Sequence, residues 1–102
     1  MTEQAAGLEL RRDDSTRRSV LLLRGDWVQG VETPLFPELR ALLNAAAPQE
    51  LALDCSELGQ WDSLLMAFLL QCHGYCRDLD ISFSDDGLPD NARRLLGIAT
   101  SV

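Results

Sequence analysis

An aspartate and a serine that follow a tryptophan are the residues of this chain with the clearest chemistry. Asp62 and Ser63 come directly after Trp61 and before the apolar segment that begins at Leu64. Aspartate is favoured before a helix, because its carboxylate accepts hydrogen bonds from free N–H groups of the first turn. The pattern predicts a helix that begins after Asp62 and carries the Ser63 hydroxyl in its first turn.

In that position Ser63 is a candidate site of phosphorylation. Helix N-termini favour anions, because unpaired N–H groups and the positive end of the helix dipole point outward. A phosphate on Ser63 would meet these donors, although beside the repelling carboxylate of Asp62, and would add nearly two negative charges. A simpler interpretation stays open, in which Asp62 caps the helix and Ser63 has no further role.

The segments on either side of Asp62 predict a buried strand and a long helix. Leu51–Asp54 is a short apolar run that ends in a polar residue, as is typical of an interior strand of a parallel sheet. We expect a turn over Cys55–Gln60, with Gly59 in a backbone conformation that other residues avoid. The helix carries apolar residues at helical spacing on one face, namely Leu65, Phe68, Leu69, Cys72 and Cys76.

The remainder of the chain predicts a hairpin, a helix, a strand and a final helix. Leu8–Arg12 and Arg17–Arg24 are strand-like segments on either side of a polar turn. Thr33 is the expected N-cap of the first helix, with a proline at the first helical position. Ile81–Phe83 is a short alternating strand, and the last helix is expected to begin at Pro89.

This order of elements predicts an α/β fold. We expect a small mixed sheet of about four strands whose last three run parallel, with the helices mainly on one face. The 102 residues are enough for one domain. Residues 1–7 carry little pattern and are expected to be disordered, so that residues 8–102 form the single domain.

Composition argues against several functions. The net charge of −7 argues against non-specific binding to nucleic acid and against docking on anionic lipid headgroups, since both depend on cations. The longest apolar run, Leu64–Leu70, is far shorter than the roughly 20 residues of a membrane span. The three cysteines, without a secretory signal, fit a reducing compartment.

Three other residues invite a functional interpretation. Cys72, His73 and Cys76 suggest a metal site, but the two cysteines share the apolar face of the predicted helix and His73 does not. Packing in the core is therefore favoured for both cysteines, and His73 is expected at the helix surface. Trp27 is either an exposed anchor for a partner or, as its large apolar area favours, a cover for one end of the core.

The sequence carries no pattern that predicts catalysis. It contains no glycine-rich phosphate loop, no metal-ligand set and no nucleophile elbow. Ser63 and His73 lie about ten residues apart along one helix, or about 15 Å, and so cannot form a catalytic pair. We expect a binding protein that is not an enzyme and has no cofactor.

The order of these motifs resembles the STAS domain family. The resemblance is carried by the L-D-x-S-x-L pattern at Leu53–Leu58 and by Trp61-Asp62-Ser63 before an apolar helix. STAS domains include bacterial anti-sigma factor antagonists and cytoplasmic domains of some anion transporters. In the antagonists, the serine or threonine after this aspartate is the phosphorylated switch, which corresponds to Ser63. The antagonists usually continue with a small residue, glycine and leucine, where this chain has Leu64–Met66.

A closer resemblance is to the N-terminal STAS domain of MlaE-like ABC transporter permeases and to MlaB-like subunits. It covers roughly residues 8–99 and is carried by Leu23–Trp27, Trp61–Leu70, Gly87–Pro89 and Arg93–Leu96. It implies a regulatory or assembly domain of an ABC-type phospholipid transport system, located in the cytoplasm at the inner face of the membrane. The implied partners are the ATP-binding subunit and the permease.

The resemblance also implies where the partner binds. The ATP-binding subunit would contact Trp61, Asp62, Ser63 and Leu64. The alternative that the family offers is an anti-sigma factor antagonist, switched when an anti-sigma factor kinase phosphorylates Ser63. A third possibility, a module that binds a small ligand or nucleotide, has been proposed for some relatives.

Overall fold

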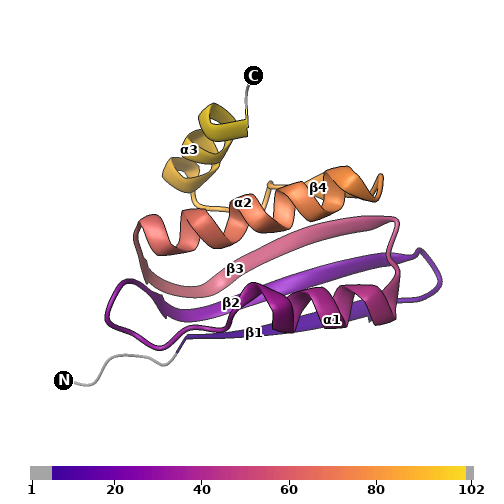
Figure 1. Cartoon of the computed structure of the whole chain (residues 1–102), viewed down its shortest axis with the longest axis horizontal. Coiled ribbons are helices and arrows are strands. Elements are labelled where there is room, and N and C mark those ends of the chain that lie inside the picture. The colour runs from indigo at the N-terminus through magenta and orange to yellow at the C-terminus, as the bar shows by residue number, and fades with distance from the viewer. Residues whose placement is uncertain (1–5, 101–102) are drawn as a thin grey trace.

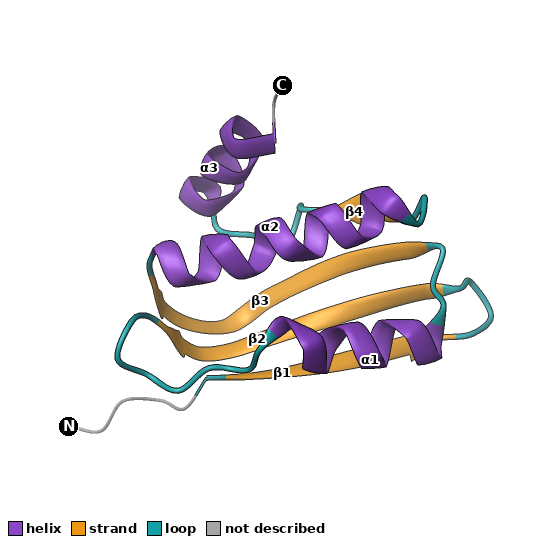
Figure 2. Ribbon diagram, viewed as in Figure 1, coloured by secondary structure: helices purple, strands orange, loops and turns teal. Residues whose placement is uncertain are grey.

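The computed structural model describes residues 6–100, which form a four-stranded mixed sheet and three helices (Figures 1 and 2). The elements along the chain are β1 (Gly7–Asp13), β2 (Arg18–Trp27), α1 (Phe36–Ala46), β3 (Glu50–Trp61), α2 (Ser63–Asp78), β4 (Ser82–Ser84) and α3 (Asp90–Thr100). None of the described helices is long and apolar enough to cross a membrane.

The strands lie in the order in which they occur in the sequence, β1-β2-β3-β4. The pair β1 and β2 is antiparallel, whereas β2, β3 and β4 run parallel to one another. Figure 2 shows α1 and α2 side by side over one face of this sheet, and α3 packs against α2. The predicted α/β class and the mixed four-stranded sheet are therefore confirmed.

The core lies between the sheet and the two helices that cover it. Trp27 is fully buried there, its ring 4.8 Å from that of Phe68 between centroids, and its indole N–H donates to the carbonyl oxygen of Arg24 at 3.1 Å. Trp27 is thus a core residue and not an exposed anchor. Cys72 and Cys76 are buried in the same cluster, as predicted.

The second half of β3 contradicts the turn predicted over Cys55–Gln60. The strand continues through these residues, with two bulges at which one residue of β2 opposes two residues of β3. Near each bulge, an aspartate carboxylate accepts a hydrogen bond from a backbone N–H group. Asp54 accepts from the N–H of Ser56 and Asp26 accepts from the N–H of Gln60, both at 2.9 Å. Because these N–H groups are hydrogen-bonded, this polar segment can remain in the sheet despite the bulges.

Gly59 has a different role from the one predicted. It does not adopt the positive φ found at Gly25 and Gly30. Instead, a Cβ atom at this position would collide with the carboxylate of Asp26. Glycine is needed here because another chain segment approaches closely, not because of the backbone conformation.

Two other predicted boundaries need correction. The predicted N-cap Thr33 lies outside the first helix, because α1 begins at Phe36 after Leu35, which has no side-chain capping bond. Residues 1–5 of the segment predicted to be disordered lie outside the described residues, while Gly7 already belongs to β1.

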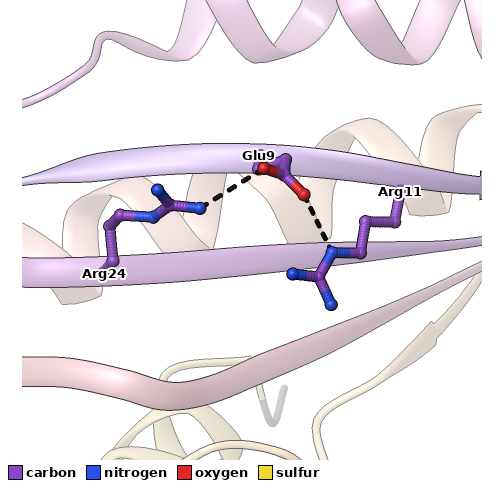
Figure 3. A network of polar contacts seen from close by, with 3 residues as sticks. All are labelled: Glu9, Arg11 and Arg24. Carbon is purple, nitrogen blue, oxygen red and sulfur yellow. Dashed lines mark hydrogen bonds and ion pairs between the residues drawn. The ribbon is translucent and has the colours of Figure 1, made fainter.

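The sheet face opposite α1 and α2 is covered by charged side chains. Arg24 donates to Glu9 at 3.3 Å across β1 and β2, and Arg11 donates to the same carboxylate at 2.8 Å (Figure 3). Arg18 and Glu50 form a further pair across β2 and β3 at 3.2 Å. Leu22 lies on this face and is only 1% exposed. Charged side chains, and not a layer of helices, therefore cover this part of the sheet.

Candidate functional site

The segment from Trp61 to Leu64 lies at the carboxyl ends of two parallel strands. Trp27 ends β2, Trp61 ends β3, and the two are partners in the sheet register. Ligands of open α/β sheets characteristically bind outside the carboxyl ends of the strands. The fold thus places Asp62 and Ser63 at the end of the sheet where binding sites usually occur.

Asp62 caps α2, as predicted, and also holds the preceding loop. One carboxylate oxygen accepts from the N–H of Leu64 at 2.9 Å, and the other accepts from the N–H of Gln29 at 3.1 Å. The backbone N–H of Asp62 donates to the carbonyl oxygen of Trp27 at 3.2 Å. Asp62 therefore joins the end of β2, the loop after it and the first turn of α2.

The contact with Gln29 is the feature of the site that the sequence did not reveal. It involves a backbone N–H group, which every residue except proline carries. Gln29 and Asp62 are also 33 residues apart along the chain. No side-chain pattern in the sequence could therefore have indicated this partner.

Ser63 is exposed in the first turn of α2. Its hydroxyl makes no hydrogen bond within residues 6–100, so it is accessible to a partner or an enzyme. The N–H groups next to it are occupied, since that of Leu64 donates to the Asp62 carboxylate and that of Leu65 to the Asp62 carbonyl at 3.1 Å. A phosphate on Ser63 would find fewer free donors than the sequence suggested.

Trp61 and Leu64 flank this serine and are half-buried. Trp61 packs against the edge of the core. The four predicted site residues thus form a short surface, which we call the Ser63 surface (Trp61–Leu64), with one exposed hydroxyl between two partly exposed apolar side chains. A polar group flanked by apolar side chains is a composition that suits contact with a protein.

Two grooves elsewhere on the molecule do not include the Ser63 surface. A groove of about 530 Å³ lies over the charged face of the sheet, and one of about 410 Å³ lies between α1 and α2. The lining of the second groove is Phe36, Arg40, Gln71, Gly74, Tyr75 and Asp78. Within residues 6–100, no three His, Cys, Asp or Glu side chains are grouped so as to hold a metal ion.

The three cysteines are free thiols that burial keeps protonated. Burial raises the pKa of Cys55 to about 11, with a further contribution from the nearby Asp54 carboxylate. Burial also raises the pKa of Cys76 to about 11 and that of Cys72 further still. Because the thiolate is the nucleophile and the metal ligand, the raised pKa values lower the reactivity of these residues near neutral pH.

Comparison with known proteins adds no family to these observations. A scan of the chain against models of protein families finds no match, and a search of curated proteins finds none either. The resemblance to STAS domains therefore rests on the sequence motifs.

Proposed function

We propose that this chain is a STAS domain that regulates or assembles an ABC-type phospholipid transport system. The observation that carries the proposal is the exposed Ser63 in the first turn of α2, directly after an aspartate that fixes the start of that helix. The motif order that resembles STAS domains places the same aspartate and serine at this junction. The mixed α/β fold, with parallel β2, β3 and β4, is compatible with the proposal.

In this proposal the Ser63 surface binds the ATP-binding subunit of the transporter. Asp62 holds both the loop after β2 and the start of α2, so little conformational freedom is lost when a partner binds. Trp61 and Leu64 contribute apolar contact on either side of the hydroxyl. Small interfaces depend on a few such desolvated residues. The domain would act in the cytoplasm, at the inner face of the membrane, in contact with the ATP-binding subunit and the permease.

The test is whether a charge at Ser63 abolishes this association. The tagged chain is purified from membranes of its source cells, and the copurifying ATP-binding subunit is identified by mass spectrometry and titrated by calorimetry. Ser63→Glu is expected to raise the Kd at least about tenfold, because the contact would bury an unpaired charge. Gln71→Glu adds the same charge at an exposed position further along α2 and should leave the Kd unchanged.

Two outcomes would contradict the proposal. One is the recovery of no ATP-binding subunit with the wild-type chain. The other is an equal Kd for the wild type and Ser63→Glu, since this would place the interface elsewhere.

The alternative function is that of an anti-sigma factor antagonist switched by phosphorylation of Ser63. The accessibility of the Ser63 hydroxyl favours it. Incubation with an anti-sigma factor kinase and ATP should then add one phosphoryl group by intact mass, and none to Ser63→Ala. An unchanged mass would exclude this function. A nucleotide-binding role has less support, because the N–H groups of Leu64 and Leu65 are already bonded to Asp62.

A further inference from the structure

The two edges of the sheet differ in how well they are protected. At one edge, β4 has three residues and pairs only with Glu50–Ala52, so the rest of β3 is not paired by it. That part of β3 also carries the two bulges. Short strands and bulges are common means by which proteins prevent edges from pairing with other chains.

The other edge, formed by β1, has no such protection. All seven of its residues, Gly7–Asp13, pair with β2 in an unbroken antiparallel register, and the strand contains no proline. No other strand among residues 6–100 pairs with its outer side. A regular strand of this length with a free row of N–H and C=O groups is a template for a further strand.

The order of charges along β1 is complementary to itself. Glu9 and Arg11 are about half exposed and lie on the charged face of the sheet, where Figure 3 shows both beside Arg24. If two copies of β1 pair antiparallel about Leu10, Glu9 of each copy lies opposite Arg11 of the other. Leu10 then lies opposite Leu10 on the face that carries α1. Opposite charges facing each other across strands are stabilising.

Two neighbouring antiparallel registers would also keep equivalent faces of the two copies on the same side of the sheet, but they lose the match between Glu9 and Arg11. A pairing centred on Glu9 places the two Glu9 side chains opposite each other. A pairing centred on Arg11 places Arg11 opposite Arg11 and Glu9 opposite Asp13. Like charges directly opposite are destabilising, so the charges select the register centred on Leu10.

The flank of α1 above this edge carries an exposed leucine. Leu42 is 44% exposed. Asn44 accepts a hydrogen bond from Tyr75 of α2, and Arg40 lines the groove between α1 and α2. Leu42 lies two residues from Arg40 and two from Asn44, which is about 200° around the helix. Because Arg40 and Asn44 face α2, Leu42 faces away from it.

Because β1 lies at the edge of the sheet beyond β2, the side of α1 away from α2 is the side of the free edge (Figure 1). Pairing about Leu10 keeps the helices of both copies on the same face, since directly opposite residues point to one side of a sheet. The leucine-bearing flanks of the two α1 helices then approach each other. Apolar burial would add to the strand pairing.

We propose that two copies of this chain form a two-fold dimer by antiparallel pairing of β1 about Leu10, which gives a continuous eight-stranded sheet. The occupant of the free edge is a second copy because the charge sequence of β1 complements itself. The inference is independent of the proposed function, since it involves neither Ser63 nor a transporter subunit.

The test uses charge reversal and sedimentation velocity on the full chain, from about 10 µM to about 1 mM, the range in which a weak dimer forms. The wild type should shift from one chain of 11.3 kDa to twice that mass as concentration rises. Glu9→Arg and Arg11→Glu each create two like-charge pairs and should raise the dimer Kd at least about tenfold. Asp78→Arg, on the exposed end of α2, changes net charge as much as Glu9→Arg and should not affect the dimer.

A mixture of the two weakened variants gives the decisive result. When Glu9→Arg meets Arg11→Glu, both cross-strand pairs again join opposite charges, so the equimolar mixture should regain the wild-type Kd. Circular dichroism confirms that each variant is folded, and Arg11→Glu retains the contact between Glu9 and Arg24. A wild type that stays monomeric throughout would overturn the proposal, and so would single variants that dimerise normally or a mixture that does not recover.

Discussion

Removal of the Asp62 carboxylate should destabilise the whole domain, although the side chain is only half-buried. Asp62→Ala loses the bond to Leu64, a helix cap worth about 1 kcal/mol, and the bond to Gln29, a second N–H contact worth about 1 kcal/mol. The expected loss is therefore about 2 kcal/mol in the free energy of unfolding. For a domain of this size it corresponds to a decrease of roughly 10 °C in Tm.

The assay is urea unfolding at pH 7, followed by circular dichroism, with two comparison variants. Asp62→Asn keeps one oxygen acceptor and can still cap α2, so it should lose about 1 kcal/mol, half of the alanine effect. Ser63→Ala should change stability by less than about 0.5 kcal/mol, because Ser63 is exposed and its hydroxyl makes no bond among the described residues. An Asp62→Ala variant within about 0.5 kcal/mol of wild type would refute the view that Asp62 holds the loop and the helix together.

The remaining predictions concern glycine packing and the thiols. Gly59→Ala and Gly87→Ala should each cost at least about 1 kcal/mol in urea unfolding, because the added methyl meets a carboxylate in the first and a backbone carbonyl in the second. Gly74→Ala, which enters open space on α2, should instead stabilise by about 0.5–1 kcal/mol. Near pH 8 the native protein should resist thiol reagents that label it fully once unfolded. Burial raises the pKa of Cys55 and Cys76 to about 11, above the unfolded value of about 8.5. The buried, protonated thiols should therefore contribute fully to stability below about pH 8.5, and the free energy of unfolding should decrease as the pH rises from there towards 11.

The elements that the sequence predicted correctly are those fixed by local pattern. The apolar periodicity of α2 and the capping preference of Asp62 both act within a few residues, and both agree with the structure. The start of α1 was missed because Leu35 provides no side-chain cap, so no polar residue marks the boundary. Local pattern is informative only where local interactions set the boundary.

The features that were missed depend on residues far apart in the chain. Cys55–Gln60 has the composition of a turn, yet it remains in β3 because Asp26, 34 residues away from Gln60, accepts an N–H group at the second bulge. The contact between Gln29 and Asp62 likewise joins residues that meet only after β2 and β3 have paired. In the candidate site, Asp62 was predictable as a cap, but its second bond to a distant loop was not.

The two proposed interfaces occupy different parts of the same sheet. The Ser63 surface lies at the carboxyl ends of β2 and β3, whereas the proposed dimer uses the lateral edge of β1. A two-fold axis through Leu10, perpendicular to the sheet, reverses the strand direction from one copy to the other. The two Ser63 surfaces would then point towards opposite ends of the extended sheet, so a partner bound at one leaves the other accessible. Failure of either interface would consequently leave the argument for the other intact.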